Sequence, residues 1–226
     1  MNSYIPYPDR PIWHERDIEY FAEHKAPIME NFQRMHFTNI NSTIPYFGPM
    51  MYFLVRQFGC EQILEIGHAE GYSAFYLAHG LQDNATRFGM KDNHYYGIDV
   101  VQTDVVTEKM ASEHLPATII NKDSMTLTKD TFPGIVFDLI FQDGCHDEEH
   151  IVYEFNTMWP QIKDNGNGYW IAHDAEGPGW HGCRAIKRIL KEQNIPHEVI
   201  TLGGQYGLMI IRNMKNFDYE NNPWKD

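Results

Sequence analysis

The sequence predicts an α/β fold in which about seven mostly parallel strands form a doubly wound sheet, preceded by an N-terminal helical cap. From residue 62 onward, short apolar runs typical of buried strands alternate with amphipathic helical segments. The composition is that of a globular protein, with 42% hydrophobic and 22% charged residues. A chain of 226 residues has room for one α/β domain and a short appendage, so we expect one principal domain.

The predicted elements follow the order of such a fold. Residues 1–43 are rich in aromatic side chains and form a cap with a helix over 15–35, and a second helix covers 49–58. Strands are expected at 62–66, 94–99, 117–121, 137–142, 168–172, 197–201 and 206–211. Helices are expected between them at 71–81, 104–113, 148–159 and 180–193. The domain therefore covers 44–214, and 215–226 form a polar tail.

The charge of the chain disfavours a nucleic-acid partner, because 31 acidic residues outnumber 18 lysines and arginines and give a net charge of -13. Residues 1–16 lack the apolar core of a signal peptide, and no stretch reaches the roughly 18 apolar residues of a membrane span. We therefore expect a cytoplasmic protein without a membrane partner. Cys60, Cys145 and Cys183 form no Cys-x-x-Cys pattern and predict neither a disulfide framework nor a structural zinc site.

A glycine-containing turn follows the first predicted strand. Gly67 and Gly71 flank it, so the backbone can adopt unusual angles and approach a ligand closely. The amides that open the next helix can hold a carboxylate or a phosphate group. A purely structural strand-to-helix turn is the alternative interpretation.

An acid at the end of the second predicted strand favours a nucleoside ligand. Asp99 lies where a carboxylate can accept hydrogen bonds from both ribose hydroxyls. The dinucleotide fingerprint requires a third glycine and places its acid about twenty residues after the turn. Asp99 follows later than that, so NAD fits this pattern less well.

Several segments resemble the class I S-adenosylmethionine-dependent methyltransferases, and within them the methyltransferase-24-like and small-molecule O-methyltransferase groups. The resemblance extends over residues 44–211. It is carried by Leu64–Gly67, Gly71–Ser73, Gly97–Asp99, Lys122–Ser124, Phe137–His146 and Ala172–Asp174. It implies a Rossmann-like domain that binds S-adenosylmethionine.

The resemblance also implies a set of cofactor contacts. Glu65 and Gly67 would line the methionine end, and Asp99 would hold the ribose. Asp123 and Ser124 would lie near the adenine. The further expected contacts are Gly71, Tyr72, Ser73, Val100 and Asp143. Structural alternatives remain for three of these residues: Glu65 as a helix-end partner, Ser73 as a helix cap and Asp123 as a turn residue.

Polar residues after the fourth and fifth predicted strands suggest catalytic groups. Asp143, His173 and Asp174 can converge on one divalent cation, Mg²⁺ or another, because neighbouring strand ends lie at the same edge of a parallel sheet. The metal-dependent O-methyltransferases place acids at these two strand ends, and His173 departs from their pattern. His146 and Asp143 are the expected catalytic residues. The imidazole of His146 can take a proton from a hydroxyl group. Capping of the next helix and metal binding are the alternatives for His146.

The leading hypothesis is therefore methyl transfer to a small-molecule acceptor, at a hydroxyl oxygen. The alternatives are a non-catalytic binding protein with the same fold, an NAD-linked oxidoreductase and a metal-dependent hydrolase. The small residues that usually fill the glycine turn in the family are replaced here by His68, Ala69 and Glu70. This departure keeps open the alternative of a non-catalytic binding protein. The aromatic cap can close over the acceptor or form a homodimer surface.

Overall fold

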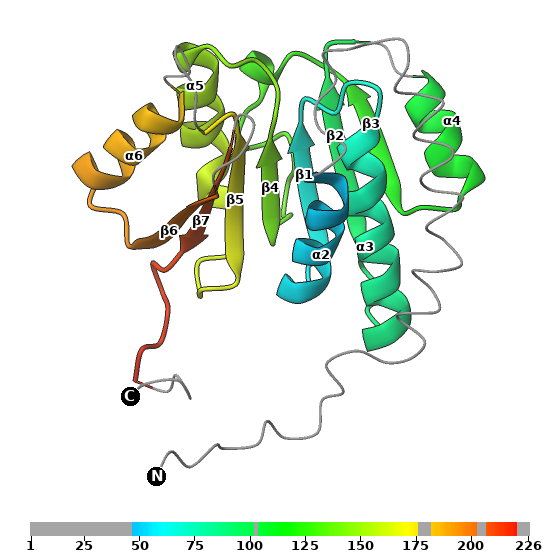
Figure 1. Cartoon of the computed structure of the whole chain (residues 1–226), viewed down its shortest axis with the longest axis horizontal. Coiled ribbons are helices and arrows are strands. Elements are labelled where there is room, and N and C mark those ends of the chain that lie inside the picture. The colour runs from blue at the N-terminus through cyan, green and yellow to red at the C-terminus, as the bar shows by residue number, and fades with distance from the viewer. Residues whose placement is uncertain (1–46, 102–103, 176–181, 203–206, 221–226) are drawn as a thin grey trace. The chain divides into compact units, whose positions relative to one another are not determined.

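The computed structural model describes residues 47–101, 104–175, 182–202 and 207–220, within a compact unit that spans 44–226. Its strands form one seven-stranded sheet in the order β3-β2-β1-β4-β5-β7-β6 (Figure 1). The predicted cap at 1–43, with its helix, lies outside the described residues, as do residues 221–226 of the predicted tail. The doubly wound α/β sheet is confirmed.

Each predicted strand of the sheet is present. The strands are β1 (Gln62–Ile66), β2 (His94–Asp99), β3 (Ala117–Asn121), β4 (Leu139–Gln142), β5 (Gly168–His173), β6 (His197–Leu202) and β7 (Leu208–Asn213). The first five strands in the chain pair in parallel, whereas β7 runs antiparallel to both β5 and β6. β4 begins later than predicted, because Phe137 forms an isolated bridge with Ile162 instead of joining the ladder.

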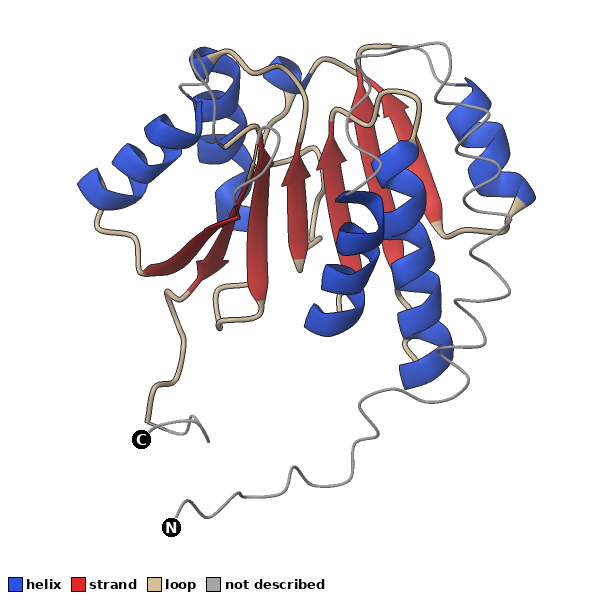
Figure 2. Ribbon diagram, viewed as in Figure 1, coloured by secondary structure: helices blue, strands red, loops and turns tan. Residues whose placement is uncertain are grey.

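The helices lie on both faces of the sheet (Figure 2). They are α2 (Phe47–Phe58), α3 (Tyr72–Phe88), α4 (Asp104–Ser112), α5 (Glu148–Met158) and α6 (Gly182–Glu192), with short 3-10 turns η1 (Ser124–Thr126) and η2 (Trp159–Gln161). α3 continues past its predicted end because Asn84 is buried and its amide donates to the carbonyls of Val55 and Cys60 at 3.0 and 2.9 Å. It ends at Gly89, whose left-handed backbone caps the helix.

The core lies between the central strands and the helices that cover them. Leu64 and Ile66 of β1 and Trp170 of β5 pack in one buried cluster with apolar side chains of α5 and α6. Strands this apolar on both faces are typical of the centre of a parallel sheet. The Trp170 ring meets Phe155 of α5 edge-on, with ring centroids 5.0 Å apart. This packing fixes the strands, and their carboxyl ends form the edge on which the candidate site is built.

None of the helices described in the structure is both long enough and apolar enough to cross a membrane.

Candidate active site

The turn between β1 and α3 is held against both neighbouring strands. The Gly67 amide donates to the Ile98 carbonyl at 2.8 Å, and the Asp143 amide donates to the Ile66 carbonyl at 2.8 Å. Gly67 has a φ of +88°, and a Cβ atom there would lie 2.4 Å from the Asp143 carbonyl oxygen. Only glycine fits this position, because both the backbone angle and the contact exclude a side chain. The turn that the sequence predicts therefore lies directly beside the end of β4.

Glu65 is a buried acid beneath this turn. Its side chain is fully buried, and the hydroxyl groups of Ser73 and Tyr95 donate to its two carboxylate oxygens. Burial raises the pKa of Glu65 to about 8, although the two hydrogen bonds act in the opposite direction. Gly71 is the N-cap residue of α3, so Ser73 binds Glu65 and does not cap the helix.

Asp99 holds two backbone turns together at the end of β2. Its Oδ2 atom accepts a hydrogen bond from the Ala69 amide at 2.7 Å, and its Oδ1 atom accepts one from the Val101 amide at 2.9 Å. Val100, another predicted cofactor contact, is 64% exposed beside it. A carboxylate has about four lone pairs, so Asp99 keeps acceptor capacity for further hydroxyl donors.

The residues that replace small side chains in the turn differ in exposure. His68 is buried, with 1% of its surface exposed, and its Nδ1 atom lies 3.1 Å from the Ala69 carbonyl oxygen. Burial lowers the pKa of His68, so the ring is held in its neutral form. Ala69 is exposed, and Glu70 is partly exposed. The unusual imidazole is thus part of the interior of the turn.

Four side chains that lie at or after the ends of β4 and β5 in the chain come together at this edge of the sheet. His173 Nδ1 lies 2.9 Å from Asp143 Oδ1 and 3.2 Å from Asp174 Oδ1. His146 Nε2 lies 3.0 Å from Asp174 Oδ2. The four residues therefore form a chain of alternating carboxylates and imidazoles across the ends of β4 and β5. Asp174 has a φ of +56°, which a short polar side chain tolerates better than most.

Burial and pairing act against each other on these groups. Burial lowers the pKa of His173, but its hydrogen bonds to Asp143 and Asp174 outweigh burial and raise that pKa to about 9. Burial raises the pKa of Asp143, and the same histidine opposes the shift. Ligand atoms of Asp143, His173 and Asp174 lie within 4.8 Å of one another, so this donor set can also surround a cation.

Residues 64–175 match a family model described as a methyltransferase domain. The match runs from β1 past the end of β5, and so includes the glycine turn, Asp99 and the four clustered side chains. The chain belongs to the methyltransferase-24-like class I methyltransferases.

Solved structures share the fold of this methyltransferase at low sequence identity. It is similar to a methyltransferase from Geobacter sulfurreducens, with a TM-score of 0.64 and 15% identity over 91% of this chain and 100% of that one. An SAH-bound methyltransferase from Podospora anserina gives a TM-score of 0.62 and 19% identity over 94% and 99% of the two chains. An O-methyltransferase from Bacillus cereus in complex with SAH gives a TM-score of 0.57 and 17% identity over 90% of this chain and 94% of that one. No curated protein matches the methyltransferase in sequence.

The sequence did not predict the contact of Tyr95 with Glu65, one of the predicted cofactor contacts of the methyltransferase. Tyr95 lies two residues before Gly97 on the same face of β2, and Gly97 pairs with Glu65 in the sheet. A Cβ atom at Gly97 would lie 2.8 Å from the Tyr95 hydroxyl oxygen. The absent side chain of Gly97 therefore lets the Tyr95 ring reach Glu65. A tyrosine two positions before a strand glycine was the signal available in the sequence.

The predicted adenine-side residues of the methyltransferase have structural partners. Asp123 Oδ1 accepts from the Met125 amide at 2.9 Å, as the turn interpretation of Asp123 expects. Ser124 Oγ donates to the buried Glu154 at 2.5 Å. Gln142 Nε2 donates to the other Glu154 oxygen at 2.5 Å, and Trp170 Nε1 donates to Gln142 at 3.2 Å. This buried network holds η1 against β4 and α5, and no periodic pattern in the sequence indicates it.

Proposed function

We propose that this protein transfers the methyl group of S-adenosylmethionine to a hydroxyl oxygen of a small molecule. The observation that carries the proposal is the pairing of His146 with Asp174 at the same sheet edge as the glycine turn and Asp99. In this proposal the glycine turn and Asp99 bind the nucleoside, and His146 acts as the base. The S-adenosylhomocysteine-bound relatives with this fold support the choice of cofactor.

The cofactor would lie over the glycine turn. Asp99 is the proposed acceptor for the ribose hydroxyls, and Glu65 with Gly67 is proposed to line the methionine end, where a cationic amine would favour the ionised form of Glu65. Gly71, Tyr72, Ser73, Val100, Asp123, Ser124 and Asp143 complete the proposed set. When bound, S-adenosylmethionine supplies a methyl group on a positively charged sulfur, which leaves as a neutral thioether.

The residues of the chain would activate and position the acceptor. His146 would take the proton of the acceptor hydroxyl, while Asp174 holds its imidazole in place and stabilises the positive charge it gains. Such a reaction needs no covalent intermediate with the protein, and much of its rate comes from holding the two reactants in line.

A divalent cation also fits the site. Asp143, His173 and Asp174 offer two carboxylates and an imidazole whose ligand atoms lie close together. A cation there would bind the acceptor oxygen and lower the pKa of its hydroxyl group. His173 lies between the two carboxylates, so metal binding requires His173 to lose its proton.

The first test is calorimetric titration of the purified protein with S-adenosylhomocysteine and, separately, with NAD, each with and without magnesium. Saturable binding of S-adenosylhomocysteine alone is the expected result. Saturable binding of NAD without S-adenosylhomocysteine binding would overturn the proposal in favour of an oxidoreductase.

The second test separates an enzyme from a binding protein. Release of S-adenosylhomocysteine would be measured with a panel of sugar, natural-product and catechol hydroxyl acceptors, and with amines as the contrasting class. Turnover with a hydroxyl acceptor is expected. Cofactor binding with turnover on amines alone would contradict the hydroxyl assignment.

A further inference from the structure

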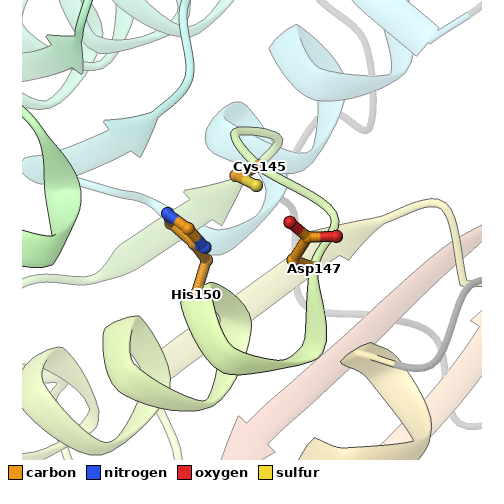
Figure 3. A group of neighbouring side chains, drawn as sticks. All are labelled: Cys145, Asp147 and His150. Atoms are coloured by element: carbon orange, nitrogen blue, oxygen red, sulfur yellow. The ribbon is translucent and has the colours of Figure 1, made fainter.

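A second group of metal-ligating side chains lies at the turn between β4 and α5. Cys145 is carried by the turn, Asp147 is the N-cap residue of α5, and His150 lies in the first turn of that helix. Figure 3 shows the three side chains gathered near the turn, with Asp147 and His150 rising from the start of α5 and Cys145 on the segment above them. Cys145 and Asp147 are exposed and His150 is partly buried, so the group is open to solvent.

The spacing of these side chains suits a small cation. Their ligand atoms, a thiol sulfur, a carboxylate oxygen and an imidazole nitrogen, all lie within 4.8 Å of one another. In a tetrahedral zinc site, ligand bonds of about 2.0 to 2.3 Å place neighbouring ligand atoms roughly 3 to 4 Å apart. Only small side-chain rotations are therefore needed to close the three ligands around an ion.

The imidazole of His150 supplies a second observation. Its Nδ1 atom is buried and has no hydrogen-bond partner among the residues that the structure describes. Buried polar atoms are nearly always paired with a protein group, water or an ion. The neighbouring His146 has a different role, because its ring pairs with Asp174.

We propose that Cys145, Asp147 and His150 bind a borderline-soft divalent transition-metal ion, with Zn²⁺ as the best match. Thiolate and imidazole ligands favour such ions over Mg²⁺, whereas the carboxylate-rich group at Asp143 suits a harder cation. Binding replaces the thiol proton of Cys145 with the metal and releases that proton to solvent. A fourth coordination position faces solvent and would be filled by water.

Cobalt(II) is the probe for this site, because a cobalt–thiolate bond gives a charge-transfer absorption that oxygen and nitrogen ligands do not give. Cys60 and Cys183 are buried, so Cys145 is the exposed thiol of the chain. The full-length protein would be titrated with Co²⁺ under reducing conditions that do not chelate the metal. We expect a saturable thiolate band with one ion per chain, which added Zn²⁺ abolishes.

Variants assign the band to its ligands. C145S should remove it, and H150A should weaken Co²⁺ binding by at least about 10- to 100-fold, because loss of a direct ligand should cost no less than loss of an outer-shell partner. D143N is the matched control, because it disrupts the carboxylate group at the strand ends and should leave the band intact. The proposal is overturned if the wild-type protein shows no thiolate band at saturating Co²⁺, if C145S retains the band, or if D143N abolishes it.

Discussion

His146 Nε2 lies 3.0 Å from Asp174 Oδ2, so a carboxylate at the end of β5 orients an imidazole carried by the turn after β4. Substituting H146Q should lower kcat by about 10²- to 10⁴-fold, the usual contribution of a positioned base. Binding of S-adenosylhomocysteine should change little, since His146 is not among the proposed cofactor contacts. Steady-state kinetics with the identified acceptor, together with calorimetry, would measure both.

Asp174 can be tested as a positioning residue by combining variants. D174N preserves a residue type that tolerates a positive φ while removing the charge that pairs with His146. If Asp174 acts through His146, D174N should lower kcat in the wild-type background and have little further effect in H146Q. Equal losses in both backgrounds would instead assign Asp174 a separate role, such as cation binding.

Asp99 should govern cofactor affinity. D99A removes the acceptor for two ribose hydroxyls and should weaken S-adenosylhomocysteine binding by at least about tenfold, because a hydrogen bond to a charged group contributes about 1.5 to 3 kcal/mol. D130A is the matched control, because it also removes one carboxylate, at an exposed position. D143A should turn over poorly, because Asp143 belongs to the chain of carboxylates and imidazoles at the ends of β4 and β5. Unchanged affinity in D99A would refute the cofactor site.

Glu65 should make stability depend on pH. Its pKa rises from 4.5 to about 8 on folding, so between these values the native state binds a proton that the unfolded state has lost. The free energy of unfolding therefore falls as pH rises through this window, by up to about 1.4 kcal/mol per unit from this group. Urea denaturation at several pH values should show this slope in the wild type and a smaller slope in E65Q. If the free energy of unfolding had the same pH dependence in the wild type and in E65Q, Glu65 would be ionised in the folded protein.

The Glu65 carboxyl group should also couple cofactor binding to proton release. If a cationic amine binds beside Glu65, it favours the carboxylate, and the proton leaves. Calorimetry near pH 7 in two buffers of different ionisation enthalpy should give different apparent binding enthalpies for S-adenosylhomocysteine. E65Q should remove that difference. Buffer-independent enthalpies in the wild type would place the amine away from Glu65.

Gly97 should be intolerant of even one added methyl group. In G97A the new Cβ atom would lie 2.8 Å from the Tyr95 hydroxyl oxygen, so the ring must move and its hydrogen bond to Glu65 is lost. We expect a loss of about 1 to 3 kcal/mol in unfolding free energy from the overpacking. G144A is the control, because its Cβ atom would meet Ile66 at 3.5 Å, an ordinary contact. Similar losses in both variants would contradict the role of Gly97.

The sequence predicted the sheet well because each strand and helix carries its own local hydrophobic pattern. It also predicted that Asp143, His173 and Asp174 can converge, since parallel strands bring their carboxyl ends to one edge. It could not predict which imidazole pairs with which carboxylate. That choice depends on side-chain directions at the ends of β4 and β5, which no local pattern records.

The contacts that sequence reasoning missed are long-range ones between polar side chains. Tyr95 and Glu65 are 30 positions apart, as are Ser124 and Glu154. In each pair a tyrosine or serine hydroxyl donates to a buried acid. Hydrophobic periodicity reports which face of an element is buried, and it carries no information on such pairing.

The antiparallel placement of β7 has a consequence for synthesis of the chain on the ribosome. β5 pairs with β4 on one side and with β7 on the other, although β7 follows β6 in the chain. A nascent chain therefore exposes one backbone edge of β5 until residues through Asn213 have emerged. The strand end that carries His173 gains its second neighbour only when its partner Leu208 in β7 has been made, so this edge of the sheet is completed only after β6 has been synthesised.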